Sequence, residues 1–363
     1  METTEVTAPG GRRDHISRRW IWFIAGVVIV VLAADLVGLN WTLPYFVFKP
    51  GPTASVEPLI YVPPADRHPM RGQVLLTTVL VSQARPPDMV NSWVNSDVEV
   101  VSTKALLGNT PPSQLQAVDA AQMQASEQSA EVVALRRLGY TVAAHGTGAL
   151  IVAVVNGTPA ATALRAGDTI VGVNGRTVDL AEDLTAALGA MKPGQAVSLS
   201  VSNVNRVVRT VNLVLASRPG SPQQPFLGVS LTTRDPTFDL PLPVRIDPGD
   251  IGGPSAGLAF TLGIMDVLTS GHMTGGLKVA ATGEIELDAS VADVGGVAQK
   301  TVSVREAGAS VFIVPKDEVA EATAHSDGKL KIIGVSTLED ALRALQRLGG
   351  DLTGIPPVPP HAG

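Results

Sequence analysis

A long apolar run near the start of the chain is the feature that most constrains its architecture. Residues 21–39 read IWFIAGVVIVVLAADLVGL, nineteen residues with a single charge at Asp35. That length is close to the ~20 residues that a helix needs to cross about 30 Å of hydrocarbon. Tryptophans lie on both sides of the run and arginines are concentrated before it, which is typical of a span whose N-terminus stays in the cytoplasm. The sequence therefore predicts a cytoplasmic segment 1–19, a transmembrane anchor in the lipid bilayer over 20–42, and an extracytoplasmic remainder: a single-pass protein of the cell membrane.

A cleaved signal peptide is the alternative interpretation of the same segment. Val31-Leu32-Ala33 offers a small-residue cleavage site, and cleavage there would release a secreted protein. The uncleaved anchor is favoured because the apolar run continues past Ala33 to Leu39. A helix of a globular core would not explain the arginines before the run or the tryptophans around it.

Composition limits the chemistry open to the rest of the chain. Its 363 residues are enough for about two to three domains of ~150 residues, and the net charge of −6, without a long basic run, argues against nucleic acid as a partner. There is no cysteine, so disulfides, cysteine-ligated zinc and cysteine nucleophiles are excluded. No two of the six histidines are spaced i, i+4, as a helical zinc motif requires. We therefore expect no metal and no other cofactor.

The first part after the apolar run, residues 43–139, contains one strand pattern and one helix pattern. The β-branched run over 72–81 predicts a buried strand. A helix is expected over 111–139, with prolines at its start and Gly139 at its end. Five residues of this helix fall near one face: Met123, Ser126, Ala130, Val133 and Leu138.

The remaining chain divides into four parts. Residues 140–217 alternate short β-branched runs with Gly/Asn turns, which indicates a small, mostly β domain. Residues 218–225 have the composition of a linker, and residues 226–348 alternate strands with helices. The tail 349–363 is rich in proline and glycine and is expected to be flexible. The predicted fold class is α+β.

A string in the middle part points to a known binding module. The sequence HGTGALIVAVVNGTPAATALRAGDTIVGVNGRTV resembles a PDZ domain, and the resemblance covers about 75 residues. It places a loop of five residues where PDZ domains have their carboxylate-binding loop: Gly146, Thr147, Gly148, Ala149 and Leu150. Backbone N–H groups there would hold a peptide C-terminus while the peptide adds as a strand. The loop departs from the usual Gly-Leu-Gly-Phe pattern, and the alternative is that its glycines only form a hairpin.

A loop rich in glycine, proline and aspartate precedes an apolar helix in the C-terminal part. Residues 247–257 read DPGDIGGPSAG, which places Ser255 just before a helix predicted to run through 258–268. A serine there exposes its hydroxyl beside first-turn N–H groups that would stabilise an oxyanion. It still needs a base to take its proton. A helix N-cap is the alternative role for a serine at such a position, and the loop alone leaves both roles open.

The residues around this loop closely resemble the proteolytic domain of Lon-type proteases. The matching segments fall in order across about 65 residues: Gly253-Pro254-Ser255-Ala256-Gly257, Thr282-Gly283-Glu284-Ile285, Gly295-Gly296, Lys300, Ala307-Gly308 and Val314-Pro315-Lys316. This resemblance implies a serine protease with a Ser–Lys dyad, in which Ser255 is the nucleophile and Lys300 the general base. It also implies that Thr282 lies near the lysine and that Gly253, Pro254 and Ala256 support the nucleophile.

A lysine can act as a base only if its pKa is depressed. An exposed ammonium has a pKa near 10.4, and burial against the valines around Lys300 would lower that value. The alternative is that Lys300 is an ordinary solvated helix residue. Lys278 and Lys316 are weaker candidates for the base, and no spacing supports a pairing of the serine with His272 or His325.

The arrangement as a whole resembles the bacterial membrane-anchored PDZ-containing Lon-like proteases, in which the PDZ module is inserted into the protease domain. No G-x-x-x-x-G-K-[ST] motif occurs, so ATP is not an expected partner. We predict an ATP-independent serine endopeptidase that cleaves unfolded or flexible extracytoplasmic protein segments. Its expected partners are protein or peptide substrates and peptide C-termini at the PDZ domain, with a homo-oligomer, by resemblance a hexamer, as the assembly to test. The alternative is a non-catalytic PDZ scaffold at the membrane.

Overall fold

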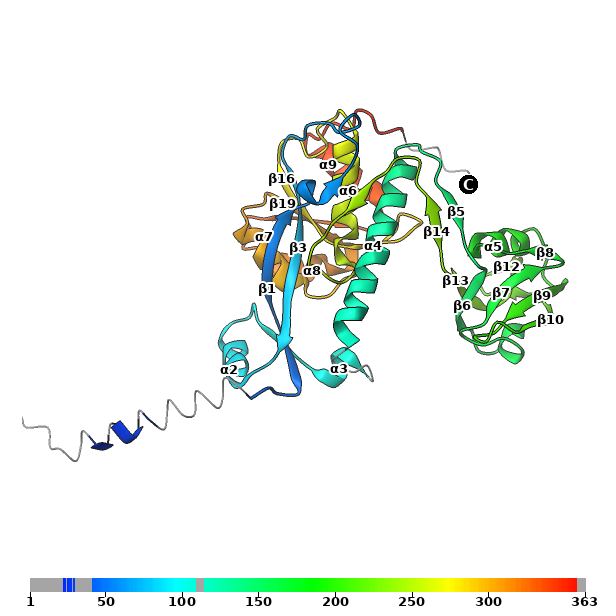
Figure 1. Ribbon diagram of the computed structural model, residues 1–363, viewed down its shortest axis with the longest axis horizontal. Helices are drawn as coiled ribbons and strands as arrows, with labels where there is room; N and C mark the ends of the chain where they lie inside the picture. The colour runs from blue at the N-terminus through cyan, green and yellow to red at the C-terminus, as the bar shows by residue number, and fades with distance from the viewer. Residues whose placement is uncertain (1–21, 24, 28, 30–40, 109–113, 358–363) are drawn as a thin grey trace, which may run out of the picture.

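The computed structural model describes residues 22, 23, 25–27, 29, 41–108 and 114–357. Two units are visible in Figure 1: a larger one built from both ends of the described chain, and a smaller one built from its middle. Two paired antiparallel strands, β5 (Ala143–His145) and β14 (Thr237–Asp239), join them. The smaller unit is thus inserted into the larger one.

The larger unit is organised around a six-stranded mixed sheet in the order β20-β19-β16-β3-β1-β4. Its strands are β1 (Tyr45–Ser55), β3 (Gln73–Gln83), β4 (Glu99–Ser102), β16 (Lys278–Ala281), β19 (Val311–Pro315) and β20 (Lys331–Val335). Strand β1 pairs antiparallel with β3 and β4, whereas β3, β16, β19 and β20 run parallel. Parallel strands covered on both faces are apolar along their length, and in β19 every residue is buried.

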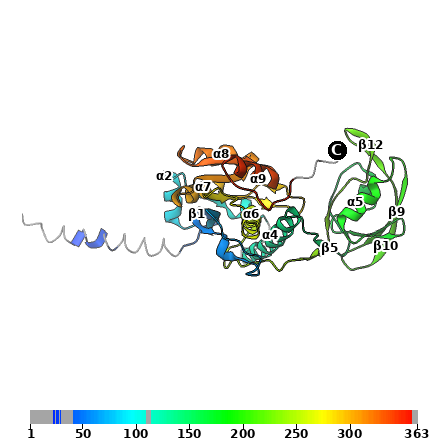
Figure 2. The ribbon, with the colours of Figure 1, turned by 90° about the horizontal axis from the view of Figure 1, so that it is seen from above.

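Helices cover both faces of this sheet (Figure 2). They are α4 (Leu115–Arg137), α6 (Gly257–Leu268), α7 (Val297–Glu306), α8 (Val319–Ala324) and α9 (Leu338–Arg347). Successive side chains of a strand point to opposite faces, so Val74 and Leu76 pack in one core with α4, α6 and α9. Leu75, between them, packs in a second core with α7 and α8. The sheet therefore holds α6 and α7 on its two sides.

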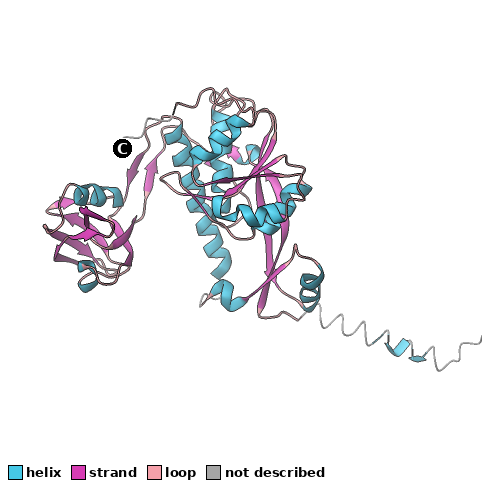
Figure 3. Cartoon of the chain, turned by 180° about the vertical axis from the view of Figure 1, so that it is seen from behind, coloured by secondary structure: helices cyan, strands magenta, loops and turns pink. Residues whose placement is uncertain are grey.

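The smaller unit has its own sheet and its own hydrophobic core (Figure 3). The sheet order is β10-β9-β7-β6-β13, with strands β6 (Ala149–Val154), β7 (Thr169–Val173), β9 (Ala196–Ser202), β10 (Val208–Val214) and β13 (Val229–Thr233). Helix α5 (Ala181–Gly189) packs on it through Leu184 and Leu188. Within the segment predicted to be a linker, 218–225, the chain forms part of a hairpin of β11 (Ala216–Arg218) and β12 (Ser221–Phe226).

Short elements complete the described chain. They are α2 (Pro86–Val94), α3 (Thr103–Leu107), β2 (Ile60–Tyr61), β8 (Arg176–Thr177), β15 (Arg245–Ile246), β17 (Glu284–Ile285), β18 (Val291–Ala292) and the 3-10 turns η1 (Glu57–Leu59), η3 (Pro159–Thr162), η4 (Pro254–Ala256) and η5 (Lys316–Glu318).

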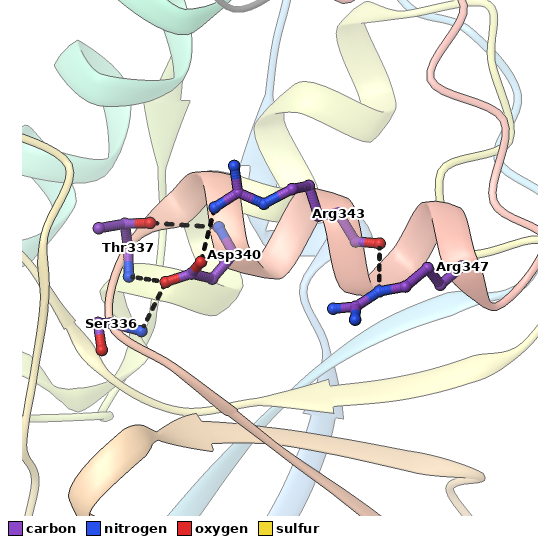
Figure 4. A network of polar contacts seen from close by, with 5 residues as sticks. All are labelled: Ser336, Thr337, Asp340, Arg343 and Arg347. Carbon is purple, nitrogen blue, oxygen red and sulfur yellow. Dashed lines mark hydrogen bonds and ion pairs between the residues drawn. The ribbon is translucent and has the colours of Figure 1, made fainter. Parts of the chain in front are cut away.

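The last helix begins at a well-formed cap (Figure 4). Thr337 accepts a hydrogen bond from the backbone N–H of Asp340 through its hydroxyl, and Asp340 in turn accepts from the backbone N–H groups of Ser336 and Thr337. Such reciprocal bonds satisfy N–H groups that a helix start leaves without a partner. Arg343 also donates to Asp340, and Arg347 donates to the Arg343 carbonyl. The cap thus fixes where α9 starts.

The membrane prediction is corrected. Crossing a bilayer takes ~20 consecutive helical apolar residues, and across the part of the chain that the structure describes no helix is long and apolar enough to do so. This finding contradicts the predicted localisation as a single-pass protein of the cell membrane. Most of the predicted span, and all of segment 1–19, lie outside the described residues.

The mixed α+β class is confirmed, and so are the two patterns of the front part. The helix expected over 111–139 runs from Leu115 to Arg137, and it buries Met123, Ser126, Ala130 and Val133, whereas Leu138, at the helix C-cap, is half-buried. The strand expected over 72–81 is β3, whose N-terminal half is buried and whose C-terminal end is exposed.

Candidate functional site

Helix α4 holds the loop that carries Ser255. Ser255 lies in the one-turn η4, which runs directly into α6. Before it, Gly253 has a φ of 84°, and its N–H donates to the Asp119 carbonyl of α4 at 2.9 Å. The Ser126 hydroxyl of α4 donates to the Pro254 carbonyl at 2.9 Å. These two bonds fix the chain immediately before the candidate nucleophile.

Close packing at the start of α6 requires glycine. A Cβ on Gly257 would lie 2.8 Å from Ser126 Oγ and 3.0 Å from the backbone nitrogen of Ile285, closer than real Cβ contacts. The Ser255 carbonyl accepts from the Gly283 N–H at 3.0 Å. The Gly-Pro-Ser-Ala-Gly spacing therefore lets the serine turn lie directly against α4 and the chain that follows β16.

Lys300 is buried and tied to this turn through Thr282. Helix α7 begins after Gly296, whose φ is 70°. It carries Lys300, which is only 3% exposed. Its Nζ donates to Thr282 Oγ1 at 3.2 Å, and Thr282 Oγ1 donates to the Ser255 carbonyl at 3.1 Å. The structure thus brings together Ser255, Thr282 and Lys300 from three separate elements.

Burial lowers the pKa of Lys300 to about 8, while the negative charge of Glu318 acts in the opposite direction. An amine with a pKa of about 8 is about one-tenth neutral at pH 7, whereas a lysine at 10.4 is neutral in fewer than about one molecule in a thousand. A neutral amine accepts a proton. The environment of Lys300 therefore suits a general base.

Ser255 and Lys300 line one cleft of about 750 Å³. Gly253, Pro254 and Ala256 line it as well, whereas Thr282 is fully buried and does not. The other walls come from β1, β3, α4 and the loop before α7. Three aspartates, Asp119, Asp250 and Asp293, line the cleft, and among its described lining residues Lys300 is the one cation.

The alternative bases lie elsewhere. His272, His325, Lys278 and Lys316 do not line the cleft. Lys278 donates to the Ala307 carbonyl at 2.9 Å, and His325 Nδ1 pairs with the Glu321 carbonyl at 3.1 Å. The geometry therefore favours Lys300 over the other bases considered from the sequence.

The predicted PDZ loop uses its backbone N–H groups within the small unit. Thr147 N–H donates to the Arg234 carbonyl at 2.9 Å, and Gly148 N–H donates to the Asp179 carbonyl at 3.0 Å. Ala149 and Leu150 pair in the sheet with β7 and β13, and a Cβ on Gly146 would lie 2.5 Å from the Asp179 carbonyl oxygen. The N–H groups of Thr147 and Gly148 are thus already bonded within the small unit.

A groove that the sequence analysis missed lies between α5 and the end of the β12–β13 segment. It has a volume of about 300 Å³ and is lined by Thr185, Leu188, Gly189, Arg218, Gln224, Pro225, Phe226, Leu227, Gly228, Val229 and Leu231. Strand β13 is at the edge of the sheet, and among the described strands its partner is β6. Gly228, in the turn before β13, has a φ of 87°. The apolar run Phe226–Leu231 was the available signal, but the Pro/Gln-rich residues before it have the composition of a linker.

Two family models match the chain. Residues 136–215 match the PDZ domain, and residues 242–347 match the Lon protease (S16) C-terminal proteolytic domain. The chain therefore contains a PDZ domain and a Lon-like proteolytic domain. The second match covers Ser255, Thr282 and Lys300, so these three residues lie within a proteolytic domain of the S16 family.

Relatives of the Lon-like domain are Lon proteases. The chain is 36% identical over 94 residues to Lon protease of Clostridium beijerinckii, covering 25% of this chain and 12% of the relative. It is 37% identical over 94 residues to Lon protease of Azospirillum brasilense, covering 25% and 11%. It is 30% identical over 143 residues to Lon protease 2 of Bacillus subtilis, covering 39% and 22%. The Lon-like chain therefore spans less than a quarter of the length of each of these relatives.

Two solved structures each match 23% of this chain. One is the PDZ domain of an SdrC-like protein from Listeria monocytogenes, with 21% identity and a TM-score of 0.22 over 23% of this chain and 87% of that one. Another is the solution structure of GtR34C from Geobacillus thermodenitrificans, with 27% identity and a TM-score of 0.21 over 23% of this chain and 97% of that one.

Proposed function

We propose that this chain is an ATP-independent serine endopeptidase that uses Ser255 as nucleophile and Lys300 as general base. The observation that carries the proposal is the hydrogen-bonded series from Lys300 Nζ through Thr282 Oγ1 to the Ser255 carbonyl, beside a cleft that both Ser255 and Lys300 line. The lowered pKa of Lys300 and the match to the S16 proteolytic domain support it.

The proposed reaction is acyl transfer. Ser255 Oγ attacks the peptide carbonyl while the Lys300 amine takes the hydroxyl proton, and the resulting ammonium returns that proton to the leaving amine. Water then attacks the acyl-enzyme, with Lys300 again as base, and releases the free carboxylate. Backbone N–H groups at the start of α6 are proposed to stabilise the oxyanion, since the N-terminus of a helix favours negative charge.

The proposed substrates are unfolded or flexible protein segments. An extended chain has the dimensions to enter a cleft of about 750 Å³ beside Ser255, whereas a folded domain must first be opened. A homohexamer, implied by the resemblance to Lon-type proteases, is retained as a proposal that the mass of the purified protein would test.

The function is tested with casein as the unfolded substrate and a fluorophosphonate as the serine-directed label. We expect casein to be degraded at the same rate with and without ATP, and peptide mapping to find the label on Ser255. Dependence on ATP, or labelling of a different serine, would contradict the proposal. No degradation together with no labelling would favour the non-catalytic PDZ scaffold.

For the small unit, we propose that an extended peptide binds in the groove between α5 and β13. The outer edge of β13 has no strand partner in its sheet, and an added strand would satisfy its backbone groups. The loop predicted from the sequence, Gly146, Thr147, Gly148, Ala149 and Leu150, is the alternative site. The groove is favoured over it because the N–H groups of Thr147 and Gly148 already bond within the unit.

Filling the groove is expected to abolish peptide binding. A Cβ on Gly189 meets nothing within 4 Å and the residue lines the groove, so Gly189→Trp would occupy the space without a clash at the backbone. Binding to an array of peptides with free C-termini is expected to fall at least ~10-fold, since one large apolar contact is worth about 1.5–3 kcal/mol. Val214→Trp, at an exposed site on β10 at the opposite edge of the sheet, is the control. Unchanged binding by Gly189→Trp would place the peptide elsewhere.

A further inference from the structure

Glu318 links the segment after β19 to the start of the helix that carries Lys300. It ends the turn η5, and its Oε1 accepts the Val294 N–H at 2.8 Å. Val294 lines the catalytic cleft, and it lies three residues before the first residue of α7, Val297. The carboxylate therefore fixes the backbone from which the lysine helix begins.

The second oxygen of Glu318 is in an unusual position. Oε2 is buried and, within the part of the chain that the structure describes, has no hydrogen-bond partner. Leaving a buried carboxylate oxygen without a partner is unfavourable, so a carboxylate kept there needs another interaction to offset the cost. Attraction to a positive charge is one such interaction.

The charged groups that face Glu318 come from three elements. Lys300 on α7 attracts it, whereas Asp293 in the loop before α7 and Glu321 on α8 repel it. Burial is the largest effect and raises the pKa of Glu318 to about 7. In the other direction, the negative charge of Glu318 raises the pKa of Lys300 against the larger effect of burial.

We propose that Glu318 is a positioning residue for Lys300, which it serves in two separable ways: its hydrogen bond to Val294 fixes the start of α7, and its negative charge stabilises the protonated amine. This inference rests on the proposed role of Lys300 as base. Glu318 is not a group that touches the substrate; it acts on the base.

The two roles predict different effects of two substitutions. Glu318→Gln keeps an acceptor for the Val294 N–H but removes the charge, so the ammonium loses a stabilising partner and the pKa of Lys300 falls. The neutral amine is then populated at lower pH. Glu318→Asp keeps the charge, but its shorter side chain does not reach the Val294 N–H from the same backbone position, so the start of α7 is less well fixed.

The experiment measures the rate of Ser255 acylation by a fluorophosphonate, and of hydrolysis of a fluorogenic peptide, from pH 5 to 10. For Glu318→Gln we expect the acidic limb of both profiles to move about 0.5–1 pH unit lower, with the plateau within about threefold of the unsubstituted protein. For Glu318→Asp we expect the acidic limb to move by less than half of the shift seen in Glu318→Gln, and the plateau rate to fall at least ~10-fold. Glu321→Gln, an exposed neighbour, is the charge control and is expected to shift the limb by less than half as much.

An unmoved limb in Glu318→Gln, or a full plateau in Glu318→Asp, would overturn the inference. Thermal unfolding of each variant separates a folding defect from a positioning defect, and the position of the limb is a readout that a purely structural role would not move. A separate test shows whether the proposed role of Lys300 as base is wrong. In that case, Ser255 would still be acylated in a Lys300→Met variant that carries no other substitution. That outcome would overturn both proposals, whereas an unmoved limb with an intact dyad overturns this one alone.

Discussion

Ser255→Ala is expected to cut the rate of casein degradation by at least ~10³-fold. The substitution removes the oxygen that would form the acyl-enzyme, and no other group can replace it in an acyl-transfer mechanism. The backbone of the turn is held by Gly253, Pro254 and the Ser255 carbonyl rather than by the serine hydroxyl. The variant should therefore keep its fold, its thermal unfolding midpoint and its ability to bind an unfolded polypeptide.

Ser303→Ala is the matched control for this experiment. Ser303 is buried on α7, close to Lys300 in sequence, and its hydroxyl donates to the Gln299 carbonyl of its own helix at 3.1 Å. It does not line the cleft, so its loss should leave the rate within about twofold. Full activity of Ser255→Ala would mean that the nucleophile is elsewhere.

Lys300→Met is expected to reduce the acylation rate of Ser255 to a similar extent, at least ~10³-fold at pH 8. Methionine has nearly the length of the lysine stem but cannot accept a proton, so the Ser255 hydroxyl would remain protonated. The unsubstituted protein should show a rate that rises with pH along a limb near the lysine pKa of about 8, because only the neutral amine is a base. In Lys300→Met this limb should disappear.

The same substitution has an expected effect on stability that separates chemistry from folding. A pKa below that of an exposed lysine means that the folded state disfavours the ammonium, so below pH 8 the buried charge lowers the free energy of unfolding. Lys300→Met removes that cost, and its thermal midpoint at pH 6 should equal or exceed that of the unsubstituted protein. Lys278→Met, which removes a partly buried lysine outside the cleft, should keep full activity. Loss of activity in both lysine variants would point to a general defect instead.

The two residues of the proposed dyad could be singled out from the sequence because their signal is local. The Gly-Pro-Ser-Ala-Gly string determines the backbone of one turn, and the glycines before α7 determine where the helix of Lys300 starts. Short motifs in the right order therefore identify Ser255 and Lys300 without any information on the sheet. The same holds for α4, where the 3.6-residue period placed Met123, Ser126 and Ala130 near one face, and the structure buries all three.

Other features depend on contacts between distant segments, and the sequence alone did not reveal them. The groove of the small unit exists because β13 pairs with β6 and leaves its other edge beside α5, a choice of partner that periodicity does not encode. In the sequence, nothing distinguishes Glu318 from an acidic residue of a solvated loop. Its role emerges only when β19 places it against Val294. The apolar run at residues 21–39 had a strong local pattern, but the structure describes too little of it to support a span.

The insertion of the small unit between β3 and β16 also has a consequence for biosynthesis. Strand β3 pairs directly with β16, and beside this pair the hydrogen bond from Thr274 to Arg71 joins residues 203 positions apart. At ~5–20 residues per second, a ribosome needs about 10–40 s to deliver the second partner after the first. The inserted unit has a core of its own and can fold during that interval. The edge of β3 that later pairs with β16 has no partner during this time. An unpaired strand edge is a site of aggregation, so the nascent chain is most vulnerable while translation passes through the insertion.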